Sequence, residues 1–88
     1  MRLSELQWDE HGEEHIARHG IGPDEVEDAA FEPAARFFRV RDDRYAVLGR
    51  TAAGRYLFAV LQPVGGGVAR VVTARPMTDK EKRRYARK

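Results

Sequence analysis

Cysteine is absent from this sequence of 88 residues, and so is any long apolar run. Without cysteine the chain forms no disulfide and offers no thiolate ligand to a metal, which is typical of an intracellular protein. No stretch approaches the ~18–20 apolar residues of a membrane-spanning helix, and residues 1–5 do not begin a secretory signal. We therefore expect a cytoplasmic protein that does not bind a membrane.

Phosphate-binding glycine loops, internal repeats and a second domain are missing as well. The only glycine run, Gly65–Gly67, is followed by neither a lysine nor a helix pattern, and it predicts a hairpin turn. A chain of 10.0 kDa has room for one hydrophobic core. We expect a single domain over residues 1–88.

Basic residues are scarce in the first part of the chain. Residues 1–34 hold two basic and ten acidic residues, whereas residues 35–88 hold fourteen basic and four acidic ones. A basic surface made by the second part would attract a polyanion. Alternatively, the acidic part packs on the basic part and the charges cancel. Charge alone does not choose between these interpretations.

All three histidines lie in one stretch, Glu10–Gly20, four residues apart. In a helix this spacing places His11, His15 and His19 on one face. Imidazoles transfer protons near neutral pH, so catalysis or contact with RNA is one interpretation, and a solvated face is another. A zinc or nickel site is a third interpretation, but a straight helix does not aim three imidazoles at one ion without strain. We expect no metal ligand and no cofactor.

The remaining pattern predicts a second helix, an antiparallel sheet and a last helix. The second helix begins after Gly22, with Pro23 in its first turn, and Pro33 stops it. Thr78–Glu81 is a capping box that opens a basic C-terminal helix. Extended segments are expected at Leu3–Trp8, Arg36–Arg41, Arg44–Arg50, Arg55–Leu61 and Val68–Arg75. The short loops predict an α+β fold with a four- to five-stranded antiparallel meander.

Arginines stand at the ends of the expected strands. Arg50 and Arg55 flank one hairpin turn, and Arg75 ends the last strand just before the C-terminal helix. A single arginine at a strand end often serves only solubility. Arg75 is the better candidate for a phosphate ligand, because its fork binds phosphate through two hydrogen bonds. On the last helix, Arg83, Arg84 and Tyr85 are candidates for RNA contact, with Tyr85 stacking on a base; a solvated face is the alternative.

Several short motifs occur in an order and spacing that resemble the BrnT family of bacterial type II toxins. These motifs are Gln7–Asp9, Arg18–Ile21, Phe31–Pro33, Leu48–Arg50, Gly54–Arg55, Val72–Arg75 and Glu81–Tyr85. The resemblance covers almost the whole chain and implies a RelE-like fold. It differs in the first helix, where the family usually has an asparagine followed by Lys-His-Gly. Here His15 stands for the asparagine and Arg18 for the lysine.

The resemblance implies metal-independent cleavage of RNA, which inhibits translation and growth. The 2′-OH of one nucleotide attacks the adjacent phosphate and leaves a 2′,3′-cyclic phosphate and a free 5′-OH. Our hypothesis makes His19 the general acid or base, with Arg18 and His15 beside it. Arg75, with Arg50 or Arg55, would stabilise the charge that develops on the phosphate.

The resemblance also implies the partners. These are an RNA substrate and a cognate BrnA-like antitoxin, with a heterotetramer as the candidate assembly and operator DNA contacted only through the antitoxin. The alternative function is a catalytically inactive RNA-binding or co-repressor partner of that antitoxin.

Overall fold

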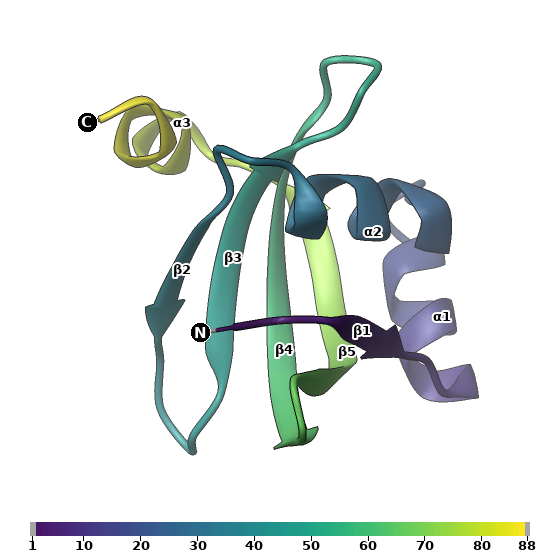
Figure 1. Ribbon diagram of the computed structural model, residues 1–88. Helices are drawn as coiled ribbons and strands as arrows, with labels where there is room; N and C mark the ends of the chain where they lie inside the picture. The colour runs from purple at the N-terminus through teal and green to yellow at the C-terminus, as the bar shows by residue number, and fades with distance from the viewer. Residues whose placement is uncertain (1, 88) are drawn as a thin grey trace.

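The computed structural model describes residues 2–87, and there a five-stranded sheet carries three helices (Figure 1). Met1 and Lys88, the ends of the expected domain, lie outside the described residues. The strands are β1 (Glu5–Gln7), β2 (Arg36–Arg39), β3 (Tyr45–Arg50), β4 (Tyr56–Gly65) and β5 (Val68–Pro76), and the helices are α1 (Glu10–Ala17), α2 (Pro23–Phe31) and α3 (Asp79–Ala86). None of these helices is long and apolar enough to cross a membrane.

The sheet has the strand order β1-β5-β4-β3-β2. Strands β2 to β5 form the predicted antiparallel meander, whereas β1 pairs with β5 in parallel. The α+β class is confirmed, and the sheet is mixed rather than wholly antiparallel. The parallel pair is possible because the whole meander lies between β1 and β5 in the sequence, as a long connection.

Helix α1 is shorter than the spacing of the histidines suggests. The Asp9 side chain caps its start, accepting a hydrogen bond of 2.7 Å from the Gly12 backbone N–H. At its end, Gly20 adopts φ +68° and the Ile21 N–H bonds the Ile16 carbonyl, which is a Schellman arrangement. His19 therefore lies in the closing turn rather than on the helix.

Helix α2 follows its sequence signals closely. The Gly22 N–H donates to the Glu25 carboxylate over 3.1 Å, and the helix ends at Phe31, two residues before the proline. Val26 and two alanines are its buried residues, as expected. The acidic residues of the helix therefore remain on its outer side.

The two faces of the sheet differ in cover. On one face, which α1 and α2 pack against, Leu57, Ala59 and Leu61 of β4 join Ile16 and Val26 in the core. The residues between them point to the opposite face, which only α3 partly covers. We call it the α3 face; Ala46 and Leu48 are fully buried on it, and the strand pairing gives it also Arg36, Phe38, Arg50, Tyr56, Phe58, Val60, Gln62, Arg70, Thr73 and Arg75.

Strand β4 extends four residues beyond the expected segment Arg55–Leu61. Its residues alternate between buried and half-buried as far as Gln62, because only one face is fully covered. It also runs through Pro63, which pairs with Ala69 of β5. Pairing with β3 ends at Leu61, so one edge of β4 is free at Pro63 and a missing N–H is tolerated there.

Candidate functional site

Basic side chains stack on aromatic rings across the α3 face. All four cation–aromatic contacts of the described residues lie here: Arg50 over Tyr56 (5.6 Å to the ring centroid), Arg75 over Phe58 (4.2 Å), Lys82 over Tyr56 (5.7 Å) and Arg84 over Phe38 (3.7 Å). Exposed aromatic rings and cations are the groups with which proteins hold single-stranded RNA. The α3 face is therefore the candidate RNA interface.

Arg75 lies on this face but is already engaged. Its two terminal nitrogens donate to the two oxygens of Glu81 over 2.8 and 2.9 Å. Partial burial raises the pKa of Glu81, but the hydrogen bonds from Arg75 and Thr78 outweigh it and hold that pKa below its usual value. The carboxylate occupies the fork that the sequence assigned to phosphate, so a phosphate must compete with Glu81.

Tyr85 is fixed at the other end of α3. Its hydroxyl donates to the Glu32 carboxylate over 2.5 Å, and the same oxygen accepts the Arg50 backbone N–H over 2.7 Å. Partial burial and the neighbouring Glu32 raise the pKa of Tyr85 to about 12. The ring packs edge-on against Tyr56 with centroids 5.8 Å apart. Tyr85 thus anchors α3 to the end of α2, and Tyr56 shares its aromatic surface.

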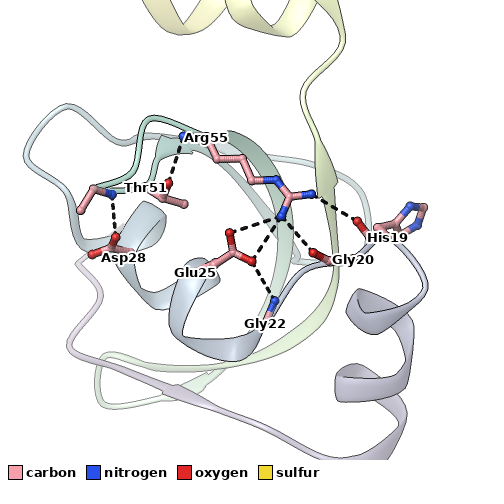
Figure 2. A network of polar contacts seen from close by, with 8 residues as sticks. His19, Gly20, Gly22, Glu25, Asp28, Thr51 and Arg55 are labelled. Atoms are coloured by element: carbon pink, nitrogen blue, oxygen red, sulfur yellow. Dashed lines mark hydrogen bonds and ion pairs between the residues drawn. The ribbon is translucent and has the colours of Figure 1, made fainter.

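Arg55 serves the other side of the molecule. Its guanidinium donates to the carbonyls of Gly20 (2.9 Å) and His19 (3.4 Å) and to the Glu25 carboxylate (3.3 Å), as Figure 2 shows. The hydrogen bond from the Gly22 N–H is the main cause that lowers the pKa of Glu25. Burial raises this pKa by a smaller amount, and Arg55 lowers it further. Arg55 therefore ties the turn between α1 and α2 to the start of β4, which is a structural role.

The structure does not bring His19 together with Arg75 or Arg50, which the sequence hypothesis groups around one phosphate. Ala74 is buried in the core with Ile16 of α1, so the next residue, Arg75, points to the opposite face. Arg50 lies on that opposite face too. The His19 imidazole is exposed and points away from the Arg55 network (Figure 2). Strand alternation, which decides the face, separates these predicted partners.

The other two histidines lie side by side. The rings of His11 and His15 have centroids 4.7 Å apart and are tilted by 42°. Between them in sequence, Gly12 is buried directly on β5, where a Cβ would come within 2.6 Å of the Val71 carbonyl oxygen. This glycine lets α1 approach the sheet closely, because it has no Cβ. In residues 2–87 no three His, Cys, Asp or Glu side chains gather as a metal site.

The remaining predicted residues are solvent-exposed. Arg18 follows α1, and Arg83 and Arg84 lie on α3, whose residues are all outside the core. Of these three, Arg84 is the one that contacts the α3 face, through Phe38. A broad groove between α2 and the β3–β4 turn is lined by four acidic residues, Asp24, Glu27, Asp28 and Glu32, by one basic residue, Arg50, and by uncharged residues. Its charge disfavours a polyanion.

Sequence reasoning did not name the aromatic residues of the α3 face. Tyr56, Phe58 and Val60 alternate with the buried Leu57 and Ala59. That alternation is visible in the sequence, but an apolar strand with two aromatic positions on its second face also fits a sheet covered on both sides. Only the position of α3 leaves the rings accessible.

The comparisons with known proteins agree with this fold. A family model described as the ribonuclease toxin BrnT of a type II toxin-antitoxin system matches residues 8–81. The chain belongs to the BrnT family. The resemblance seen in the sequence is thereby confirmed: BrnT proteins are ribonuclease toxins, whose substrate is RNA and whose partner is a cognate antitoxin.

A solved BrnT structure supports the fold. The ribonuclease toxin BrnT of Brucella abortus superposes with a TM-score of 0.68 at 23% identity, over 85% of this chain and 97% of that one. At this identity the likeness concerns the BrnT fold alone. No curated protein matches the chain significantly.

Proposed function

We propose that this BrnT-family chain binds single-stranded RNA on its α3 face and cleaves it without a metal ion. The observation that carries the proposal is the set of four cation–aromatic contacts on the face that α1 and α2 leave uncovered. The rings stack with bases, and the cations neutralise phosphates. RNA lies in the cytoplasm, where the toxin would act and inhibit translation.

The cleavage uses the 2′-OH as the nucleophile. The O2′–P bond forms as the P–O5′ bond breaks, so the products are a 2′,3′-cyclic phosphate and a free 5′-OH. A base must take the 2′-OH proton, and a cation must stabilise the negative charge on phosphate in the transition state. Arg50 supplies that charge, and Arg75 does so when Glu81 yields its place. DNA lacks the nucleophile and is not cut.

A cognate BrnA-like antitoxin is the proposed regulator. The free toxin is active, and binding of the antitoxin, in a heterotetramer, blocks the RNA. Operator DNA is contacted only through the antitoxin.

The direct test is incubation of the purified protein with single-stranded RNA in EDTA. We expect cleavage that persists in EDTA and leaves cyclic phosphate ends, read by mass spectrometry of the products. Loss of cleavage in EDTA with recovery on adding a divalent metal would refute the metal-independent mechanism. His19→Ala tests the sequence hypothesis that His19 transfers the proton.

The second candidate is a module that binds RNA or an antitoxin but does not cut. One observation favours it: the α3 face carries arginines and aromatic rings, while the three histidines belong to α1 and its closing turn. Retained RNA binding with no cleavage, together with normal growth when the gene is induced alone, would establish this second function.

A further inference from the structure

A small pocket of about 330 Å³ opens where α1 meets β5. Its lining includes His11 and Asp9 from the start of α1, Arg44 just before β3, and Arg70 of β5 with the neighbouring Val71 and Val72. Two guanidinium groups and one imidazole thus converge from three segments that lie far apart in the sequence. None of these three groups belongs to the site predicted from the sequence.

Both arginines are oriented but not saturated. The Arg44 Nε donates to the Gln62 side chain over 3.1 Å, and the Arg70 Nε lies 3.7 Å from the Asp9 carboxylate. Gln62 pairs with Arg70 in the sheet, so Arg44 extends across β4 toward β5. Among residues 2–87 the terminal nitrogens of both guanidiniums have no hydrogen-bond partner. These free forks match the two oxygens of a phosphate.

The histidine flank of α1 borders this pocket. Gly12 and Ile16 are the buried residues of the helix. At 100° per residue, His11 and His15 then lie together on one flank, and Glu13 lies on the other. The His15 ring packs against the His11 ring. The pocket is therefore lined by His11 and by the capping residue Asp9, whereas Glu13 lies on the other flank of α1.

We propose that this pocket binds the phosphate at which RNA is cut, with Arg44 and Arg70 as its ligands and His11 as the proton-transfer residue. The inference rests on the proposed ribonuclease function. It moves the proton transfer from His19 to His11 and the charge stabilisation from Arg50 and Arg75 to Arg44 and Arg70, so that Arg50 and Arg75 only bind the RNA. His11 accepts the 2′-OH proton as the O2′–P bond forms. The P–O5′ bond breaks, and the leaving O5′ takes a proton from water.

The location connects the pocket to the RNA interface. Arg70 and Arg75 are five residues apart on β5. Both side chains lie on the α3 face because a β-bulge, where the pairing shifts from Val60–Thr73 to Leu61–Val71, interrupts the alternation between them. At ~3.3 Å per residue they are separated by roughly 15 Å. An RNA strand therefore extends from the pocket along β5 to the aromatic rings near α3. The rings hold the bases next to the cut, and the pocket holds the reacting phosphate.

The test compares His11→Gln, Arg44→Gln and Arg70→Gln with Arg39→Gln as the charge-matched control. Arg39 is exposed on β2 and pairs with Asp43, outside the pocket. Cleavage is measured with single-stranded RNA in EDTA, and binding with 2′-O-methyl RNA, which lacks the nucleophile. His11→Gln should slow cleavage at least ~100-fold and leave binding unchanged. Each arginine variant should weaken binding several-fold and lower the salt slope by about one.

The outcomes separate this inference from the proposed function. Two results with a wild type that cleaves RNA would refute the pocket assignment and leave the ribonuclease function intact. In one, all three pocket variants behave like Arg39→Gln; in the other, only His19→Gln loses cleavage. If the wild type leaves RNA intact, titration with inorganic phosphate decides. If phosphate shifts the His11 imidazole resonances in the wild type but not in Arg70→Gln, the pocket binds an anion although the protein is not a ribonuclease. Absent shifts overturn both.

Discussion

The two faces of the sheet use the same strands for different purposes. On the helix face, Leu57 and Leu61 are almost completely buried under α1 and α2. On the α3 face, Tyr56, Phe58 and Val60 are half-buried and lie among arginines. Apolar burial, worth ~25 cal/mol per Å², stabilises the first face, and accessible rings and cations suit the second for RNA. Stability and binding are thus separated by side-chain alternation within single strands.

The same difference appears in the ion pairs. The Arg55 guanidinium donates hydrogen bonds to Gly20 and Glu25 within the fold. The terminal nitrogens of Arg44 and Arg70, by contrast, have no partner among the described residues. Arg75 is intermediate, because its guanidinium forms an ion pair with Glu81 but both side chains remain partly exposed. An arginine at a strand end is therefore a functional candidate only where the fold leaves its fork unpaired.

The largest expected effect is on stability. Leu61→Ala, on the helix face, should lower the free energy of unfolding by about 2–5 kcal/mol, because it leaves a cavity in the core. The adjacent Val60→Ala, on the α3 face, should cost only about 1 kcal/mol. Urea denaturation of both variants gives the comparison. Equal losses would contradict the division between the faces.

The next effect concerns RNA affinity. Phe58→Leu removes the ring under Arg75, and stacking on one base is worth about 1–3 kcal/mol, so the dissociation constant should rise about tenfold or more. Phe37→Leu, whose ring packs toward the core on the other face, is the matched control and should bind RNA as the wild type does. Fluorescence anisotropy with 2′-O-methyl RNA measures both. A larger loss of RNA affinity for Phe37→Leu than for Phe58→Leu would place the RNA on the helix face and contradict the proposal.

A smaller effect tests the anchor of α3. Tyr85→Phe loses the hydrogen bond to Glu32 and should cost about 1 kcal/mol at neutral pH. Tyr85 has a pKa of about 12 in the folded protein, against about 10 when unfolded, so its protonated form is favoured by folding. The stabilisation is complete below pH 10 and is lost as the pH rises toward 12. Unfolding curves between pH 8 and 12 should therefore converge for the two proteins.

The smallest effect concerns the Arg75–Glu81 pair. The pKa of Glu81 is lowered by folding, so its contribution is present above the unfolded value of about 4.3 and is lost as the pH falls through the folded value. Because both side chains are partly exposed, Glu81→Gln should cost less than about 1 kcal/mol at pH 7. The cost should vanish in acid. Since the variant frees Arg75, its RNA affinity should rise about two- to threefold, and an unchanged affinity would show that Arg75 does not meet the RNA.

Much of the fold follows from local signals. Asp9 caps α1, Pro23 opens α2 and the Thr78–Glu81 box opens α3, because each satisfies backbone groups within a few residues of itself. The family could be predicted too, from short motifs in a fixed order. Local chemistry of this kind is complete in the sequence.

The candidate site depends on contacts that local signals do not contain. The sequence hypothesis assigns His19 and Arg75 to the same phosphate, but the structure places Arg75 on the face away from α1. Arg44 and Arg70 received no role from the sequence, because nothing in their neighbourhoods distinguishes them from other surface arginines. Their pocket exists only when α1 is placed against β5.

The sequence by itself determined the helices, the meander, the basic second half of the chain and the family. The tertiary structure decided which arginines form ion pairs with Glu25 and Glu81. It also decided which face has accessible aromatic rings, and which histidine lies in a pocket with free guanidinium groups. The physical reason is one of range. Caps, turns and periodicity are set within a few residues, whereas the pairing of charges depends on which strands and helices become neighbours.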